Sequence, residues 1–273
     1  MYVGVDIGGT KTLVGAFTND GELREHNRFP TPSDYPNFLS ELAQCVDKMS
    51  TKEFRTGCVA IPGRVDRKEG VGIAFGNLPW KRVPIQSDLE HIFGCPMLVE
   101  NDANLAGLSE AICIRHQYTR ILYVTVSTGI GTGIIADGKI DPDFADSEGG
   151  HIILEHDGKL QRWEDFASGR AIVTHFGKRA EDITDAKTWK IIARNLAIGL
   201  IDLIAVVQPQ AIVMGGGVDS YFERLEKYLE SELQRYETPL TPIPPILKAK
   251  RPEQAVVYGC YELARMAYGK HHS

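Results

Sequence analysis

The chain has 273 residues, of which 43% are hydrophobic and 24% charged, and its formal net charge is −6. A chain of this length can bury a substantial core in one large domain or in two of ordinary size, and we favour two. The composition is globular, no segment is apolar for long enough to cross a bilayer, and no basic block offers a surface for nucleic acid. We therefore expect neither a membrane nor a nucleic acid as partner.

The sequence enters a strand-like stretch directly after Met1, with no segment in front of it that resembles a secretory signal. The five cysteines are widely scattered and form no CxxC pair. These features predict a cytoplasmic protein whose cysteines are buried free thiols.

Residues 2–29 alternate in the manner of strands, with interruptions at Gly8-Gly9-Thr10-Lys11 and at Asn19-Asp20-Gly21. This pattern predicts three antiparallel strands. Residues 120–140 repeat the order of strand, glycine-rich turn, strand, Asp-Gly turn and strand. The repeat predicts two related halves.

Amphipathic helices follow each of these strand segments. In the first half, Phe38, Leu39, Leu42 and Val46 share one helical face. In the second, apolar positions with the same periodicity mark a long helix at Trp189, Ile192, Leu196 and Leu203. The fold class is therefore α/β with mixed sheets, and we expect two lobes that the chain crosses at a helix beginning near Ala103.

Three glycine-rich loops could hold phosphate through converging backbone N–H groups. The loop at residues 8–11 is followed by a strand, so it is not a P-loop, and the loop at residues 127–133 lacks the GxGxxG spacing of a Rossmann turn. The loop at residues 214–217 precedes a helix predicted over residues 220–235, which suits a nucleotide at a strand-to-helix turn. Each loop alone could be an ordinary turn, but three together favour a nucleotide site.

Six motifs occur along the chain in the order DIGGTK (residues 6–11), IPGRVD (61–66), GNLPW (76–80), ENDAN (100–104), TGIGTGI (128–134) and SEGGH (147–151). In this order they resemble the ROK family of sugar kinases and sugar-responsive repressors, and the resemblance extends from Tyr2 to about Tyr268. It implies a two-lobed, actin-like and hexokinase-like fold, duplicated from a ribonuclease H-like unit, with an interlobe cleft. The implied N-terminal lobe comprises residues 1–105, completed by a C-terminal helix at 254–273, and the larger C-terminal lobe comprises residues 106–253.

The resemblance also implies ATP and Mg²⁺ as cofactors. Asp102 resembles the general base that takes a proton from the sugar hydroxyl, a role typically worth about 10²- to 10⁴-fold in rate. By local sequence alone, Asp102 or Asn101 could instead cap the helix that follows. Asp6 resembles a residue that holds Mg²⁺ through water, with a buried strand-end hydrogen bond as the structural alternative.

The implied nucleotide contacts lie in the three glycine-rich loops. One side of the triphosphate would face the first loop and the other side the second, with the third loop beside the adenosine. Ser127 and Thr132 stand where many relatives have glycine, and Ser127 could alter the nucleotide contacts. The residues concerned are Gly9, Thr10, Lys11, Thr128, Gly129, Gly215, Gly216 and Gly217.

The implied sugar contacts are carboxylates, amides and an imidazole, which can read the orientation of hydroxyls through hydrogen bonds. Taken singly, such residues are more often solvated charges or structural side chains. Their positions in the motifs favour a sugar site made of Asn101, Glu148, His151, Glu164, Asn77, Gly63 and Arg64.

The chain departs from the family at one place that concerns metal binding. Many relatives have three cysteines between the histidine of the GH motif and the later glutamate, whereas residues 151–164 contain none. His151 and His156 alone are not a zinc ligand set. We therefore predict no structural zinc, and we expect packing of Trp163 and Phe166 to take over part of its role.

The sequence thus predicts an ATP-dependent hexose kinase that acts on the 6-hydroxyl, most simply of glucose, because residues 77–85 resemble the glucokinase branch. Within the class, polyphosphate-dependent glucokinase, fructokinase, mannose kinase and N-acetylhexosamine kinase stay open. From another class, a DNA-binding sugar repressor is disfavoured, because the phosphate-site strand follows Met1 immediately. A sugar sensor without catalysis is disfavoured by Asp6, Lys11 and Asp102. Relatives of this family are commonly dimers, and we expect a homodimer.

Overall fold

Strand β1 (Tyr2–Ile7) is the centre of a five-stranded mixed sheet in the order β3-β2-β1-β4-β8. In this computed structural model, which describes residues 1–251 and 253–272, β1 pairs antiparallel with β2 (Lys11–Phe17) and parallel with β4 (Thr56–Ile61). Strands β3 (Leu23–Pro30) and β8 (Met97–Asn101) form the edges. The three antiparallel strands predicted at the N-terminus are confirmed.

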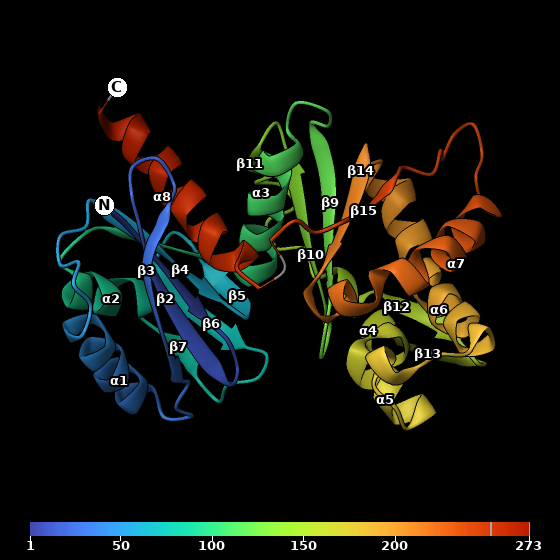
Figure 1. The fold of residues 1–273 in the computed structure, drawn as a ribbon, viewed down its shortest axis with the longest axis horizontal. Helices are drawn as coiled ribbons and strands as arrows, with labels where there is room; N and C mark the ends of the chain where they lie inside the picture. Colours follow the sequence, from blue (N-terminus) through green and yellow to red (C-terminus); the bar gives the residue numbers. More distant parts are fainter. Residues whose placement is uncertain (252, 273) are drawn as a thin grey trace. The chain divides into compact units, whose positions relative to one another are not determined.

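Helices pack on both faces of this sheet. Val3 and Val5 of β1 belong to a buried cluster with Phe38 and Leu89, which lie on α1 (Tyr35–Asp47) and α2 (Ile85–Phe93). Gly4 points the other way, where a Cβ atom would lie 2.9 Å from the side chain of Val257 on α8 (Ala255–His272). Figure 1 shows α8, in red, beside the first strands of the chain, in blue. Since side chains alternate along a strand, both faces of β1 must be apolar or small.

A smaller antiparallel sheet belongs to the same unit and consists of β5 (Gly63–Asp66), β6 (Val71–Phe75) and β7 (Lys81–Val83). After β8, the chain enters α3 (Asp102–Ile114). The contacts of the chain define a first unit of Met1–Ser109 with Gln254–Ser273, and a second of Glu110–Glu253. The boundary predicted after residue 105 lies within α3, four residues before this division, and residue 273 lies outside the described residues.

The second unit repeats the architecture of the first. Its five-stranded sheet has the order β11-β10-β9-β14-β15, and the central β9 (Arg120–Val126) is again antiparallel to its neighbour β10 (Ile130–Ala136) and parallel to β14 (Ala211–Gly215). The edge strands are β11 (Lys139–Ile140) and β15 (Ile246–Lys248). This order confirms the repeat that the sequence predicted.

The helices of the second unit are α4 (Trp163–Ala167), α5 (Gly169–Phe176), α6 (Ala186–Val207) and α7 (Phe222–Gln234). Three short 3₁₀ helices, η1 (Gly149–His151), η2 (Ala180–Asp182) and η3 (Gly216–Tyr221), and a hairpin of β12 (Ile153–His156) and β13 (Lys159–Arg162) complete it. The helix predicted to begin at Ser220 begins two residues later, because residues 216–221 form the tighter turns of η3. All four apolar positions predicted on the long helix α6 are buried.

No helix within residues 1–251 and 253–272 has both the length and the apolar character that a bilayer crossing requires.

Candidate active site

Asp6 is the penultimate residue of the central strand β1, partly exposed just before the first glycine turn. Burial raises the pKa of Asp6 from 3.8 to about 6, and the positive charges of Lys11 and Arg28 act in the opposite direction. A single hard carboxylate suits Mg²⁺, which is usually held by one or two carboxylates together with water and phosphate oxygens. Among the described residues, no group of three or more His, Cys, Asp or Glu could hold a metal by itself. Asp6 therefore fits the predicted role of a carboxylate that holds Mg²⁺ through water.

The first glycine turn is held by a hydrogen bond of its own and by Thr31, the residue that follows β3. Its tightest internal bond runs from the Gly8 N–H to the Lys11 carbonyl at 3.0 Å. The Thr31 hydroxyl donates to the Gly8 carbonyl at 2.8 Å, and the Thr31 N–H donates to the Thr10 carbonyl at 3.0 Å. Thr10 and Lys11 remain exposed at the turn. Thr31 could not be predicted from the sequence, because no local pattern links it to a turn more than 20 positions earlier.

The GNLPW motif lies directly against this turn. A Cβ atom on Gly9 would be 2.7 Å from the Cβ of Asn77, so only glycine permits the approach. Gly76, which precedes Asn77, donates its N–H to the carbonyl of Pro62 at 2.8 Å. The predicted phosphate turn and the predicted sugar residue Asn77 are therefore neighbours in the first unit.

The IPGRVD and ENDAN motifs meet in the same unit. The side-chain amide of Asn101 donates to the Gly63 carbonyl at 3.1 Å, and strands β4 and β8 bring Ile61 opposite Asn101. Arg64 is exposed on β5, next to this bond. Four motifs that are far apart in sequence thus occupy one continuous region of the first unit.

Asn101 caps helix α3. Its side-chain oxygen accepts the N–H groups of Ala103 at 2.8 Å and Asn104 at 3.2 Å, the pattern of an N-cap. Asp102 also accepts the Ala103 N–H, at 2.8 Å. Asn101 is therefore the N-cap of α3, as the structural alternative proposed. Its side-chain amide has two N–H groups, of which one binds the Gly63 carbonyl and the other is the group for the predicted sugar contact. Asp102 is partly exposed at the first helical position.

In the second unit, the TGIG turn lies against Glu164. The Ile130 N–H donates to Glu164 Oε2 at 3.4 Å, and a Cβ atom on Gly129 would be 2.5 Å from the same oxygen. On the other carboxylate oxygen, His151 Nε2 lies at 3.5 Å and Arg162 Nη1 at 3.3 Å. The carboxylate of Glu164, a predicted sugar residue, therefore lies against His151, another predicted sugar residue, and against Gly129, a predicted phosphate residue.

Thr132, which departs from the family glycine, has a clear structural role. It is buried, and its hydroxyl accepts the Gly149 N–H at 3.1 Å. Gly149 opens η1, and the His151 N–H donates to the Glu148 carbonyl at 2.9 Å. Thr132 therefore fixes the short turn that carries Glu148, which is exposed, and His151.

The third glycine loop lies against the TGIG turn. Gly217 and Thr128 line one cavity of about 460 Å³, together with Ser127. Gly216 has a φ of +79°, and a Cβ atom on it would collide with the hydroxyl of Thr125. Gly215 ends β14. Other residues of this cavity could not be predicted from the sequence. Its apolar lining includes Val126, Val173 and Tyr221, and its charged lining consists of Arg170, Arg179 and Glu181, with Arg179 Nη1 3.5 Å from Glu181 Oε1.

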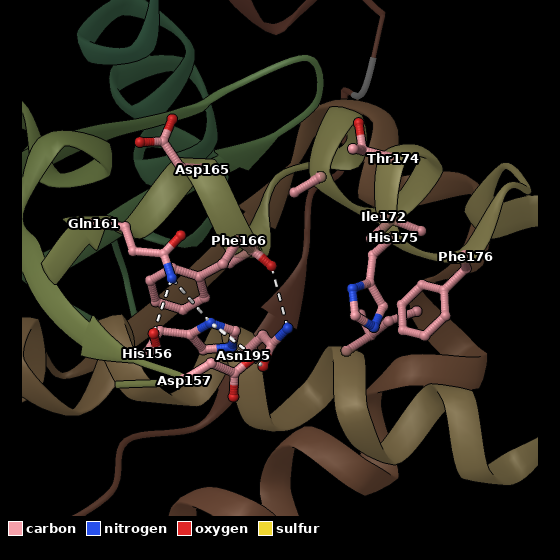
Figure 2. Close-up of a pocket in the computed structure, with 13 residues that line it drawn as sticks. His156, Asp157, Gln161, Asp165, Phe166, Ile172, Thr174, His175, Phe176 and Asn195 are labelled. Atoms are coloured by element: carbon pink, nitrogen blue, oxygen red, sulfur yellow. Dashed lines mark hydrogen bonds and ion pairs between the residues drawn. The ribbon is translucent and has the colours of Figure 1, made fainter. Parts of the chain in front are cut away.

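The hairpin β12–β13 lies between His151 and Glu164, in the segment that contains no cysteine, and its packing is shown in Figure 2. The His156 ring stacks on the Phe166 ring with centroids 4.2 Å apart and an interplanar angle of 11°. His156 Nε2 lies 3.2 Å from the Asn195 side-chain oxygen on α6, while the Asn195 amide donates to the Phe166 carbonyl at 3.1 Å. The fully buried Trp163 donates to the Asn195 carbonyl at 3.1 Å. The hairpin, α4 and α6 are thus joined by aromatic packing and hydrogen bonds.

These side chains do not fit zinc. His156 is engaged by Phe166 and Asn195, and His151 lies beside Glu164, so the two imidazoles belong to separate interactions. A structural zinc site needs four convergent ligands, most often thiolates and imidazoles. A third histidine, His175 on α5, lines a cavity of about 270 Å³ beside the hairpin, together with His156.

We predict that the purified protein contains no stoichiometric zinc, because the hairpin is held by the contacts just described. Metal analysis by mass spectrometry checks this directly. A zinc chelator is expected to leave sugar phosphorylation unchanged when Mg²⁺ is resupplied. One zinc per chain, lost together with activity and restored by added zinc, would contradict the prediction.

Duplicated mixed sheets with glycine turns at their strand ends define the class of actin-like folds, in which this chain has solved neighbours. The structure superposes on a ROK family glucokinase from Streptomyces griseus, crystallised with glucose and AMPPNP, with a TM-score of 0.82 and 26% identity over 97% of this chain and 99% of the other. The model of the ROK family matches residues 2–267. The chain therefore belongs to the ROK family.

Other relatives are named for different activities. An N-acetyl-D-glucosamine kinase from Haemophilus influenzae is 29% identical, with 96% of this chain and 99% of that protein aligned. An inorganic polyphosphate/ATP-glucomannokinase from an Arthrobacter strain superposes with a TM-score of 0.72 and 27% identity, and 99% of each chain is covered.

Proposed function

We propose that this chain is an ATP-dependent hexose kinase that transfers the γ-phosphate of ATP to the 6-hydroxyl of a hexose, with glucose as the preferred acceptor. Kinase relatives across the whole chain length support the sugar kinase activity. The observation that carries the proposal is the contact of Glu164 with the TGIG turn (residues 128–131). This contact brings a carboxylate of the proposed sugar site next to a turn of the proposed phosphate site. A kinase needs its acceptor and donor sites side by side.

In the proposed reaction, the side chains that orient the sugar hydroxyl are those of Asn101, Glu148, His151 and Glu164. Asp102 takes the hydroxyl proton as the oxygen attacks the γ-phosphorus. Phosphoryl transfer involves little covalent work by the protein, so positioning and charge stabilisation provide most of the acceleration.

The phosphates are proposed to bind at the two glycine turns. Backbone N–H groups of the first turn and the Lys11 ammonium face one side, and Thr128 with Gly129 faces the other. Asp6 would hold Mg²⁺, which supplies charge neutralisation on the phosphate oxygens when bound. The adenosine is proposed to lie in the cavity lined by Thr128 and Gly217.

A second donor is favoured by a specific observation. Arg170 and Arg179 line the same cavity as Thr128, and guanidinium groups suit an extended chain of phosphates as well as a nucleotide. Glu181 lines the cavity too and pairs with Arg179 at 3.5 Å, so Arg170 is the cation on which this alternative rests. The Arthrobacter relative is named for both donors. Polyphosphate is therefore the alternative donor, and N-acetylhexosamine, fructose and mannose are the alternative acceptors.

A coupled assay that compares ATP with polyphosphate across a panel of hexoses tests the proposal. We expect the highest kcat/KM with ATP and glucose. No turnover with any sugar would remove the kinase proposal, and hydrolysis of ATP that does not depend on sugar would require a different function. The proposal includes a homodimer, and sedimentation that shows only a monomer would remove that part.

Glu148→Gln is expected to weaken sugar binding by about tenfold, because the amide keeps the size of the side chain but loses the charge that strengthens hydrogen bonds to hydroxyls. Glu148 is exposed, so the fold should be unaffected. The sugar KM and the sugar Kd from calorimetry check this, with Glu155→Gln on the neighbouring hairpin as control. An unchanged Kd would place Glu148 outside the sugar site.

A further inference from the structure

The carboxylate of Glu100 lies immediately before Asn101 and Asp102, and it is only 4% exposed. Four donors reach it. Oε1 accepts the Asn101 N–H at 2.8 Å and the Asn104 side-chain amide at 3.0 Å, and Arg67 supplies the other two bonds. These hydrogen bonds hold the buried carboxylate in one position and orientation.

Arg67 binds Glu100 with two parallel hydrogen bonds. Its Nε donates to Oε2 at 2.7 Å and its Nη2 donates to Oε1 at 2.6 Å. A guanidinium matches a carboxylate in this two-point manner, which fixes the plane of the carboxylate as well as its position, whereas a lysine ammonium acts as a point charge. The Arg67 side chain is 32% exposed, so it compensates the buried charge from the solvent side.

Glu100 connects Arg67 to the turn from β8 to α3, so the orientation that Arg67 imposes on the carboxylate also restrains this turn. The Glu100 carboxylate holds the Asn101 N–H on one side of the turn and the Asn104 side chain on the other. The same Asn101 caps α3 through its side-chain oxygen and binds the Gly63 carbonyl through its amide. Asp102 lies between Asn101 and the capped residues, so these hydrogen bonds restrain the backbone on both sides of it.

We infer that Arg67 and Glu100 are positioning residues for the candidate base Asp102 and for the candidate sugar ligand Asn101. The inference rests on the proposed function, because it concerns the reaction that Asp102 would assist. Neither side chain needs to touch the substrate. Their contribution is the orientation of Asp102 relative to the sugar hydroxyl, and an error of about 1 Å in such an orientation can cost on the order of 100-fold in rate.

Disruption of an ion pair that only stabilises the fold should lower the melting temperature and leave kcat unchanged, whereas disruption of a positioning pair should also lower kcat. The same unit contains a suitable comparison in helix α8, where Arg265 Nη2 lies 2.8 Å from Glu262 Oε2. That glutamate side chain is 10% exposed and that arginine 40%, which is close to the burial of Arg67 and Glu100. Within the described part of the chain, the side-chain hydrogen bonds of this pair join Arg265 to Glu262, and neither residue belongs to a motif of the candidate site.

The test compares Arg67→Lys and Glu100→Gln with Arg265→Lys and Glu262→Gln in the full chain. We expect the first two to lower kcat by at least about tenfold, with the ATP KM changed by less than about twofold, because orientation of the base affects the chemical step. The α8 variants are expected to lower the melting temperature by a similar amount and to leave kcat unchanged. Arg67→Lys conserves the charge of the side chain, and Glu100→Gln conserves its shape. If one of these variants fails to fold, the other still tests the inference.

Chemical rescue supplies a readout that loss of stability would not give. Because Arg67 is partly exposed, added guanidinium ion at millimolar concentration is expected to restore part of kcat in Arg67→Ala and none in Arg265→Ala. A folded Arg67→Lys or Glu100→Gln variant with the kcat of the wild type would overturn the inference, as would equal losses of kcat in the α8 variants. A wild-type protein that phosphorylates no sugar would instead remove the proposed function itself.

Discussion

Asp102→Asn is expected to lower kcat with glucose by about 10²- to 10⁴-fold, while the sugar KM changes by no more than a few-fold. The amide has nearly the same shape as the carboxylate and can still accept the Ala103 N–H, so the start of α3 should keep its geometry. It cannot accept the proton of the sugar hydroxyl. The loss should therefore fall on the chemical step, and steady-state kinetics with both substrates varied would show it.

The matched control is Asp20→Asn. Asp20 is also an aspartate of the first unit, but it is exposed in the turn between β2 and β3, away from the six motifs. It should keep the kcat of the wild type. A kcat for Asp102→Asn within about threefold of the wild type would assign the base to another residue, because general-base catalysis is worth more than that.

Asp6→Asn is expected to have two opposite effects, a loss of turnover of about 100-fold or more and a gain in stability. The loss follows if Asp6 attracts the cation that neutralises the phosphates, a form of charge stabilisation worth several kcal/mol. In the wild type, the same role predicts that turnover falls as the pH drops below about 6, because the pKa of Asp6 is raised to about 6 and the protonated acid has no charge. Initial rates across a range of Mg²⁺ concentrations check both statements.

The gain in stability follows from the sign of the pKa shift. The folded-state pKa of Asp6, about 6, is above the value of 3.8 for the unperturbed group, so the folded chain binds this proton more tightly than the unfolded chain. The free energy of unfolding therefore falls as the pH rises through this interval, and the full penalty is present at pH 7. Asn cannot ionise, which should raise the free energy of unfolding by about 1–3 kcal/mol at pH 7.

Denaturant unfolding at pH 7 and at pH 4 separates this effect from a general change in packing. The gain of Asp6→Asn over the wild type should be clear at pH 7 and small at pH 4, where Asp6 is protonated. A variant that is less stable than the wild type at pH 7 would show that the ionised carboxylate is favourably bound in the fold.

The sequence by itself determined the class of fold and several of its elements. Alternating apolar residues around residues 8–11 and 127–133 predicted both sets of antiparallel strands, and the apolar face of residues 189–203 predicted α6. These signals are local, because strand alternation and helical periodicity depend on neighbouring residues. The six motifs likewise identified the ROK family, which the family model confirms.

Only the tertiary structure decided which of these residues contact one another. Glu164 reaches the TGIG turn from 34 positions away, Arg67 reaches Glu100 from 33 positions away, and Thr31 holds a turn that belongs to another hairpin. Such contacts depend on the order of strands in the sheet and on the path of each connection, and no local pattern encodes them. The sequence also left the cap of α3 open between two residues of suitable type, and the geometry of the turn assigned it to Asn101. A side chain's partner is fixed by packing, because many sequences with the same periodicity can place different polar groups at the same strand end.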